Sequence, residues 1–130
     1  MTKKVLVVDD DQDVRSFVIT VLEENGYTPL VAKDGIEGKA LIEQESPDLV
    51  VLDVLMPRGS GIRLYHKLKT DDQFKDLPVI MFTGIALRSF LKSQKALDKF
   101  GAQPVPEPEI YLEKPVEPEE LAEAVKKAIG

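Results

Sequence analysis

Short runs of apolar, mostly β-branched residues recur along the chain and alternate with longer amphipathic stretches. The clearest runs lie at residues 5–8, 49–52 and 79–82, and each is apolar at every position. Such runs are typical of strands buried on both faces, as in a parallel sheet covered by helices. In the stretches between them, apolar residues return at the spacing of a helix face, as at Val14, Phe17, Val18, Val21 and Leu22. This alternation predicts right-handed βαβ units and an α/β fold.

We expect five strands, at residues 5–8, 28–32, 49–52, 79–82 and 110–112, alternating with five helices. Local signals support the helix bounds. Asp34, with Glu37 three positions later, is typical of a helix start, and Pro118 is suited to the first turn of the last helix. The 130 residues fit one domain, residues 1–130, so any effector domain is expected to be another molecule.

Composition excludes several classes of function. The chain has 23 acidic and 17 basic side chains and a net charge of -6, which argues against direct nucleic-acid binding through a broad basic face. It has no cysteine, so disulfides, thiolate metal sites and cysteine nucleophiles are excluded, and a reducing cytoplasm suits it. The apolar segment near the N-terminus covers only residues 5–8, too short for a signal peptide or a membrane span.

Polar and charged side chains follow four of the five predicted strands. The first strand runs into Asp9, Asp10 and Asp11, the third into Asp53, the fourth into Thr83 and the fifth into Lys114. Ligands of open α/β sheets bind beyond the carboxyl ends of the strands, so these groups are expected to converge.

An aspartate after a strand is, taken alone, more often a turn or helix cap than a metal ligand. Carboxylates from neighbouring strands would repel each other, however, unless a cation lay between them. Oxygen ligands without His or Cys suit Mg²⁺, with Mn²⁺ possible. Asp10 and Asp53 would hold the metal with Asp9 in support, Lys114 would pair with Asp53, and Thr83 would hydrogen-bond a phosphoryl oxygen.

Four segments together carry a resemblance to a known family. They are Val7-Val8-Asp9-Asp10, Asp53-Val54-Leu55-Met56-Pro57, Phe82-Thr83-Gly84 and Tyr111-Leu112-Glu113-Lys114-Pro115. In this order the chain resembles the receiver domains of two-component response regulators, the CheY-like, flavodoxin-like fold, from about residue 4 to residue 129.

The resemblance implies a three-layer sandwich with strand order 2-1-3-4-5 and a receiver that takes a phosphoryl group on Asp53 from a histidine kinase. It implies that Asp9, Asp10 and Asp53 bind the metal, joined by the backbone carbonyl of Leu55. It also makes the bond between Lys114 and Pro115 a candidate for the cis form.

The resemblance further implies that Thr83 and Tyr111 form the switch pair. Output would pass through the surface of the fourth helix, fifth strand and fifth helix, to a downstream protein or into a homodimer. The expected partners are thus a sensor histidine kinase or phosphotransfer protein and an effector, in the cytoplasm and without a membrane contact.

Two features depart from the family pattern. The interval between Thr83 and Lys114 is several residues longer than usual, with the extra length around residues 103–109, and we expect this insertion to reshape partner or dimer contacts unless it is a tolerated surface loop. Leu55 and Ile85 are apolar at positions where polar groups can place a hydrolytic water, which predicts slow autodephosphorylation.

Two other functions stay open on the sequence. The first is a magnesium-dependent phosphohydrolase of the haloacid-dehalogenase class, which needs a second Asp two residues after its nucleophile to act as general acid. The residue at that position after Asp53 is Leu55. Asp9 does have Asp11 two residues later, but the chain lacks room for the cap domain of such an enzyme. The second is a receiver-like scaffold that binds partners without phosphorylation, but the intact set of acids argues against it.

Two other features carry no function. The one histidine, His66, is expected to have a surface role rather than to be a phosphohistidine or a metal ligand. Gly59-Ser60-Gly61 lacks the third glycine of a dinucleotide-binding loop.

Overall fold

Five parallel strands form one sheet in the computed structural model of the chain, which describes residues 2–57, 60–99 and 106–130. The strand order is β2-β1-β3-β4-β5, as the resemblance implied. The elements in chain order are β1 Lys4–Val8, α1 Gln12–Glu24, β2 Thr28–Ala32, α2 Gly35–Glu45, β3 Leu49–Leu52, α3 Ser60–Thr70, β4 Val79–Thr83, α4 Leu87–Lys99, β5 Ile110–Glu113 and α5 Pro118–Ile129. The predicted α/β fold and its five strands are therefore confirmed.

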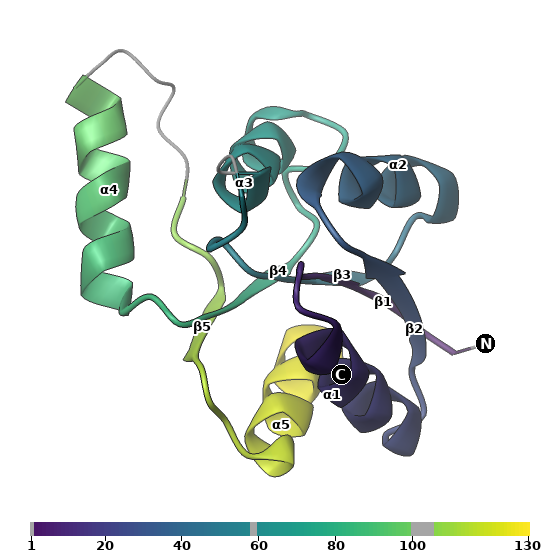
Figure 1. Ribbon diagram of the computed structural model, residues 1–130. Helices are drawn as coiled ribbons and strands as arrows, with labels where there is room; N and C mark the ends of the chain where they lie inside the picture. Colours follow the sequence, from purple (N-terminus) through teal and green to yellow (C-terminus); the bar gives the residue numbers. More distant parts are fainter. Residues whose placement is uncertain (1, 58–59, 100–105) are drawn as a thin grey trace.

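Helices cover both faces of the sheet and enclose two cores. Helices α2 and α3 lie over one face and α1 and α5 over the other (Figure 1). Side chains alternate between the two cores along each strand: Leu6 and Val8 of β1 face α2 and α3, whereas Val5 and Val7 face α1 and α5. This explains why β1 is apolar at every position.

The helix bounds follow the local signals in the sequence. Asp34 accepts a hydrogen bond from the Glu37 N–H at 2.8 Å and caps α2, while Pro118 opens α5. Among the described helices, none is both long and apolar enough to cross a membrane. The bond between Lys114 and Pro115 is cis, as predicted.

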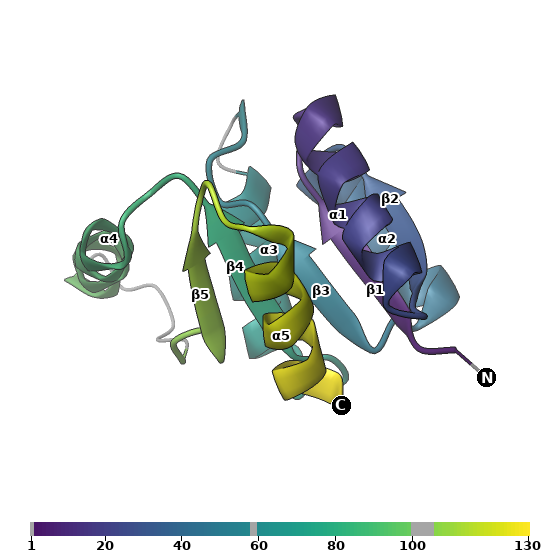
Figure 2. The ribbon, with the colours of Figure 1, turned by 90° about the horizontal axis from the view of Figure 1, so that it is seen from below.

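Helix α4 lies beyond the β5 edge of the sheet rather than over a face, as both ribbon views show (Figures 1 and 2). Phe90, from its first turns, is buried and packs between the rings of Tyr65 and Tyr111, with centroid distances of 6.3 and 5.7 Å. The sequence suggested a buried stripe of Phe90, Leu91, Leu97 and Phe100. Phe90 is buried and Leu91 partly so; the side chain of Leu97 and all of Phe100 lie outside the described residues.

The described end of the segment that the sequence predicts to be an insertion is tied to the body of the domain. Glu109 accepts a hydrogen bond from the Val79 N–H at 2.9 Å and forms an ion pair with the buried ammonium of Lys69 at 3.7 Å. The Tyr65 hydroxyl donates to the carbonyl of Pro106. This end of the segment therefore bridges α3 and the start of β4, while residues 103–105 lie outside the described part.

Candidate functional site

Two aspartates that are distant in sequence meet where β1 and β3 end side by side. The pairing of Val8 with Leu52 places Asp9 and Asp53 at neighbouring strand ends, and the Asp53 N–H donates to the Val8 carbonyl at 3.0 Å. Asp10 follows in the same turn, and one oxygen from each of the three carboxylates lies within 4.8 Å of the others. The structure therefore brings together the three acids that the sequence selected.

Burial differs among these acids. The side chains of Asp9 and Asp53 belong to residues that are 1% and 5% exposed, whereas Asp10 is exposed to solvent. Asp53 accepts a hydrogen bond from the Leu55 N–H at 2.8 Å, and Asp9 accepts one from the Asp11 N–H at 2.9 Å. These bonds fix the two buried carboxylates and leave Asp10 at the open rim.

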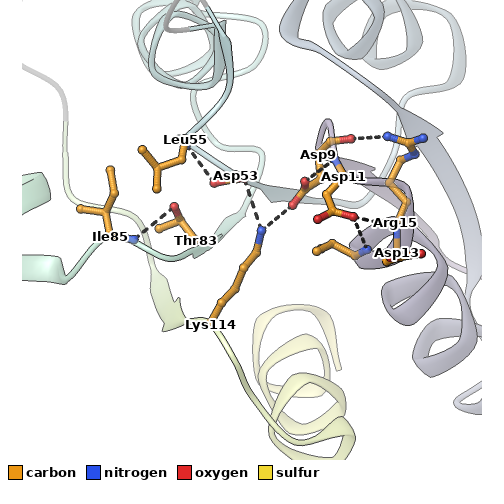
Figure 3. A network of polar contacts seen from close by, with 10 residues as sticks. Asp9, Asp11, Asp13, Arg15, Asp53, Leu55, Thr83, Ile85 and Lys114 are labelled. Carbon is orange, nitrogen blue, oxygen red and sulfur yellow. Dashed lines mark hydrogen bonds and ion pairs between the residues drawn. The ribbon is translucent and has the colours of Figure 1, made fainter.

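Lys114 reaches into this cluster from the turn after β5 (Figure 3). Its Nζ lies 2.7 Å from Asp9 Oδ2 and 3.3 Å from Asp53 Oδ2, so one ammonium bridges both buried carboxylates. Burial raises the pKa of Asp9 above its usual value, against the opposing effect of the hydrogen bonds from Lys114 and the Asp11 N–H. Burial also disfavours the charged form of Lys114, but the hydrogen bond to Asp9 and the charge of Asp53 hold its pKa above its usual value.

Thr83 and two apolar side chains, those of Leu55 and Ile85, form the side of the site away from Asp9. Thr83 ends β4, is fully buried, and accepts a long hydrogen bond of 3.5 Å from the Ile85 N–H. Leu55 is 55% exposed and Ile85 half-buried, and Figure 3 shows both on the same side of Asp53 as Thr83. Neither side chain can donate or accept a hydrogen bond there.

Tyr111 is bonded to the backbone of the loop beside the site. Its hydroxyl donates to the Ile85 carbonyl at 2.7 Å, and its ring packs on Phe90. Burial, followed by the negative charges of Glu113 and Asp53, raises the pKa of Tyr111 to about 12. The predicted switch partner of Thr83 is thus bonded to the loop that follows Thr83.

Two residues to which the sequence assigned no place in the metal site also shape it. Asp11, the third aspartate of the run, caps α1 by accepting from the N–H groups of Asp13 at 2.8 Å and Val14 at 3.3 Å. Arg15 donates to the Asp9 carbonyl at 2.7 Å. Asp11 illustrates the capping role that an aspartate after a strand has most often. His66 lies half-buried on α3.

The donor set fits a hard divalent cation. Three carboxylates and one ammonium leave a formal charge of two negative units in the cluster. Oxygen ligands of this kind suit Mg²⁺, which commonly keeps several waters and takes few protein carboxylates. The carbonyl of Leu55 as a further ligand stays a prediction.

Alkaline pH is expected to destabilise the fold. Tyr111 and Lys114 have raised pKa values, and burial, with the charges of Glu109 and Glu107, also raises the pKa of Tyr65. Above about pH 10, the folded chain therefore retains protons that the unfolded chain loses, so the free energy of unfolding falls as pH rises. Urea unfolding between about pH 8 and about pH 11 measures this decline. Tyr111→Phe should make the decline shallower, and a flat profile in the parent chain would contradict the prediction.

Comparisons with known proteins agree with this geometry. The family model described as "Response regulator receiver domain" matches residues 5–126. The phosphate regulon transcriptional regulatory protein PhoB of Escherichia coli is 33% identical over 126 residues, 97% of this chain and 51% of PhoB. This chain therefore spans about half the length of that relative. The polar-differentiation response regulator DivK of Brucella ovis is 27% identical over 130 residues, covering 100% of this chain and 98% of DivK.

Solved structures give the same result. The chemotaxis response regulator CheY4 of Vibrio cholerae has a TM-score of 0.81 at 27% identity, covering 98% of this chain and 99% of CheY4. A CheY-like response regulator receiver domain protein of Methanospirillum hungatei has a TM-score of 0.81 at 30% identity, covering 99% of this chain and 94% of that one. With its sheet order and its family match, this chain belongs to the response regulator receiver domains of two-component systems.

Proposed function

We propose that the chain is a phosphorylation switch, in which Asp53 accepts a phosphoryl group from the phosphohistidine of a sensor kinase or phosphotransfer protein. The observation that carries this proposal is the bridge from Lys114 to Asp9 and Asp53 within an acid cluster that still has a net negative charge. A structural ion pair alone would need one carboxylate for one ammonium. The excess acid supports a site for a divalent ion, which together with Lys114 would offset the negative charge of an incoming phosphoryl group.

The chemistry is a single transfer. A carboxylate oxygen of Asp53 bonds to phosphorus as the phosphorus–nitrogen bond to the donor histidine breaks, and the imidazole leaves with the electron pair. Mg²⁺ at Asp9, Asp10 and Asp53, when bound, neutralises charge on the phosphoryl oxygens. Lys114, only 3.3 Å from Asp53, is near enough to pair with the same oxygens, and the Thr83 hydroxyl can donate to one of them.

The output would pass from Thr83 to Tyr111. Tyr111 is bonded to the Ile85 carbonyl, so a shift of the loop after Thr83 toward a phosphoryl group would alter or break that bond. Its ring packs on Phe90 of α4, which links the loop to the surface of α4, β5 and α5. An effector protein or a second copy would read that surface, in the cytoplasm, with no direct nucleic-acid contact by this domain.

Labelling with a small phosphodonor tests the proposal against an enzyme or a scaffold. With acetyl phosphate and Mg²⁺, intact-mass measurement should show one phosphoryl group per chain, none in Asp53→Asn and none after chelation of the metal. Asp48→Asn, a change at an exposed aspartate outside the cluster, is the matched control and should label normally. Continuous release of phosphate over many turnovers would instead indicate a phosphohydrolase, and the absence of labelling a scaffold.

The lifetime of the phosphorylated form should exceed seconds. Leu55 and Ile85 lie on the Thr83 side of Asp53 and offer no group to place an attacking water. Leu55→Asn should shorten the lifetime about tenfold, because one hydrogen bond to the attacking water would lower the activation barrier of hydrolysis by roughly 1.4 kcal/mol. Val31→Asn, an exposed apolar-to-amide change on edge strand β2, should leave it unchanged. Loss of the label within seconds in the parent chain would contradict the prediction.

A further inference from the structure

A groove of about 720 Å³ lies between α2 and α3, next to the acid cluster but distinct from it. Residues from both helices and from the turns before them line it, among them Asp10, Lys33, Ile36, Lys39, Arg63 and Lys67. Asp10 alone belongs both to this groove and to the acid cluster. An occupant of the groove would therefore extend to the rim of the phosphorylation site.

Positive charge is concentrated here in a chain with a net charge of -6. Lys33, Arg63 and Lys67 are exposed, and none of the ion pairs within the described ranges includes them. Lys39, the fourth cation, pairs with Glu43 at 2.7 Å. Of the two acids in the lining, Asp34 is engaged in capping α2 and Asp10 faces the acid cluster. The groove thus keeps three cations without a carboxylate partner.

The backbones of α2 and α3 approach each other at the groove. A Cβ on Gly35 would lie 2.5 Å from the Ser60 carbonyl oxygen, so the first turns of α2 and α3 are in contact. The amino-terminal ends of both helices lie at the groove, and their dipoles add to its positive potential. The Ser60 hydroxyl is buried and has no hydrogen-bond partner among the described residues.

The groove is also lined by an exposed apolar side chain, that of Ile36. Ile36 is 84% exposed, the highest value among the exposed large hydrophobic residues of the described chain. It lies in the first turn of α2 at the same groove. Exposed apolar side chains with a charged surround are typical of protein docking sites. The lining includes no aromatic ring on which a nucleotide base could stack, which argues against a nucleotide.

We propose that this groove docks an acidic segment of a partner protein, with carboxylates on Lys33, Arg63 and Lys67 and an apolar side chain on Ile36. Charge complementarity selects the segment, and contact with Ile36 adds apolar burial. The site lies across the sheet from α1 and α5 and apart from the α4 surface. The groove would therefore allow one partner to stay bound beside Asp53 while a second partner binds the surface of α4, β5 and α5.

Fluorescence anisotropy of a short labelled peptide of Glu and Leu tests the proposal without phosphodonor or Mg²⁺, so its outcome is separate from that of the labelling experiment. Arg63→Glu with Lys67→Glu should weaken binding at least about tenfold, and Ile36→Ala about fivefold. Lys126→Glu with Lys127→Glu, a matched charge reversal at exposed positions on α5, should leave the affinity unchanged. Added salt should weaken binding by the parent chain.

Three results would overturn the proposal. The two charge reversals could weaken binding equally, which would mean a general charge effect. A peptide with Gln in place of Glu could bind as tightly, which would remove the role of the cations. Pyrophosphate or duplex DNA could bind more tightly than the acidic peptide and in a manner dependent on Arg63 and Lys67, which would assign the groove to a small anion or to nucleic acid. Thermal melts check that every variant still folds; each charge reversal places at least one acid in the last turn of a helix and should lower the melting temperature slightly.

Discussion

Replacing Lys114 by Met should lower the free energy of unfolding at neutral pH, without metal ions, by roughly 3–5 kcal/mol. The change leaves the buried carboxylates of Asp9 and Asp53 near each other with no counter-charge. Removal of one partner of a buried ion pair is costly because the remaining charge stays desolvated. Urea unfolding in a chelating buffer measures the loss, with Lys126→Met on the exposed side of α5 as the matched control.

The loss should depend on pH in a defined direction. Burial already raises the pKa of Asp9, and without Lys114 two of the effects that oppose this rise disappear. A carboxyl whose pKa is raised by folding takes up a proton more readily in the folded chain, so the stability of the variant should recover as pH falls toward about 5. Asp9→Asn combined with Lys114→Met should recover part of the stability at neutral pH. An equal loss at both pH values would show that Lys114 contributes by packing rather than by charge.

The sequence predicted the fold because the local apolar patterns of the strands and helices agree with the tertiary arrangement in which they are buried. Apolar runs such as Leu49–Leu52 are buried on both faces, and a parallel sheet places their carboxyl ends together. Once the strands were identified, the meeting of Asp53 with Lys114 followed from sheet geometry. The strand that begins at Ile110 was also predicted, although a segment with three prolines, residues 103–109, precedes it.

What the sequence could not predict depends on contacts between distant backbones. The sequence selected Asp9 and Asp10 for the metal site, but only the structure shows that Asp11, the next aspartate, caps α1. The burial of Lys69 depends on the carbonyls of Lys75 and Leu77, which precede β4, and on its ion pair with Glu109. The groove between α2 and α3 depends on how closely two helices approach, which no local pattern encodes.

Gly61 marks the closest of these backbone contacts. A Cβ at this position would lie 2.1 Å from the Asp53 carbonyl oxygen and 2.8 Å from the Val54 Cα. These are backbone atoms and cannot rotate away, so the loop that carries Asp53 would have to move. The sequence showed only a turn-rich segment here, because the need for a glycine arises from the close approach of α3 to the end of β3.

Gly61→Ala should therefore lower the free energy of unfolding by about 1–3 kcal/mol and slow the labelling of Asp53 by acetyl phosphate. Helix propensity alone would predict the opposite, a gain of up to roughly 1 kcal/mol, because Gly61 lies within α3. Gly84→Ala is the matched control, since its added Cβ would meet only the Leu55 side chain at 3.9 Å. Urea unfolding and labelling rates of both variants decide between the two effects. If Gly61→Ala is as stable as the parent and labels at the same rate, close backbone packing does not position Asp53, and the loop adjusts without cost to the acceptor.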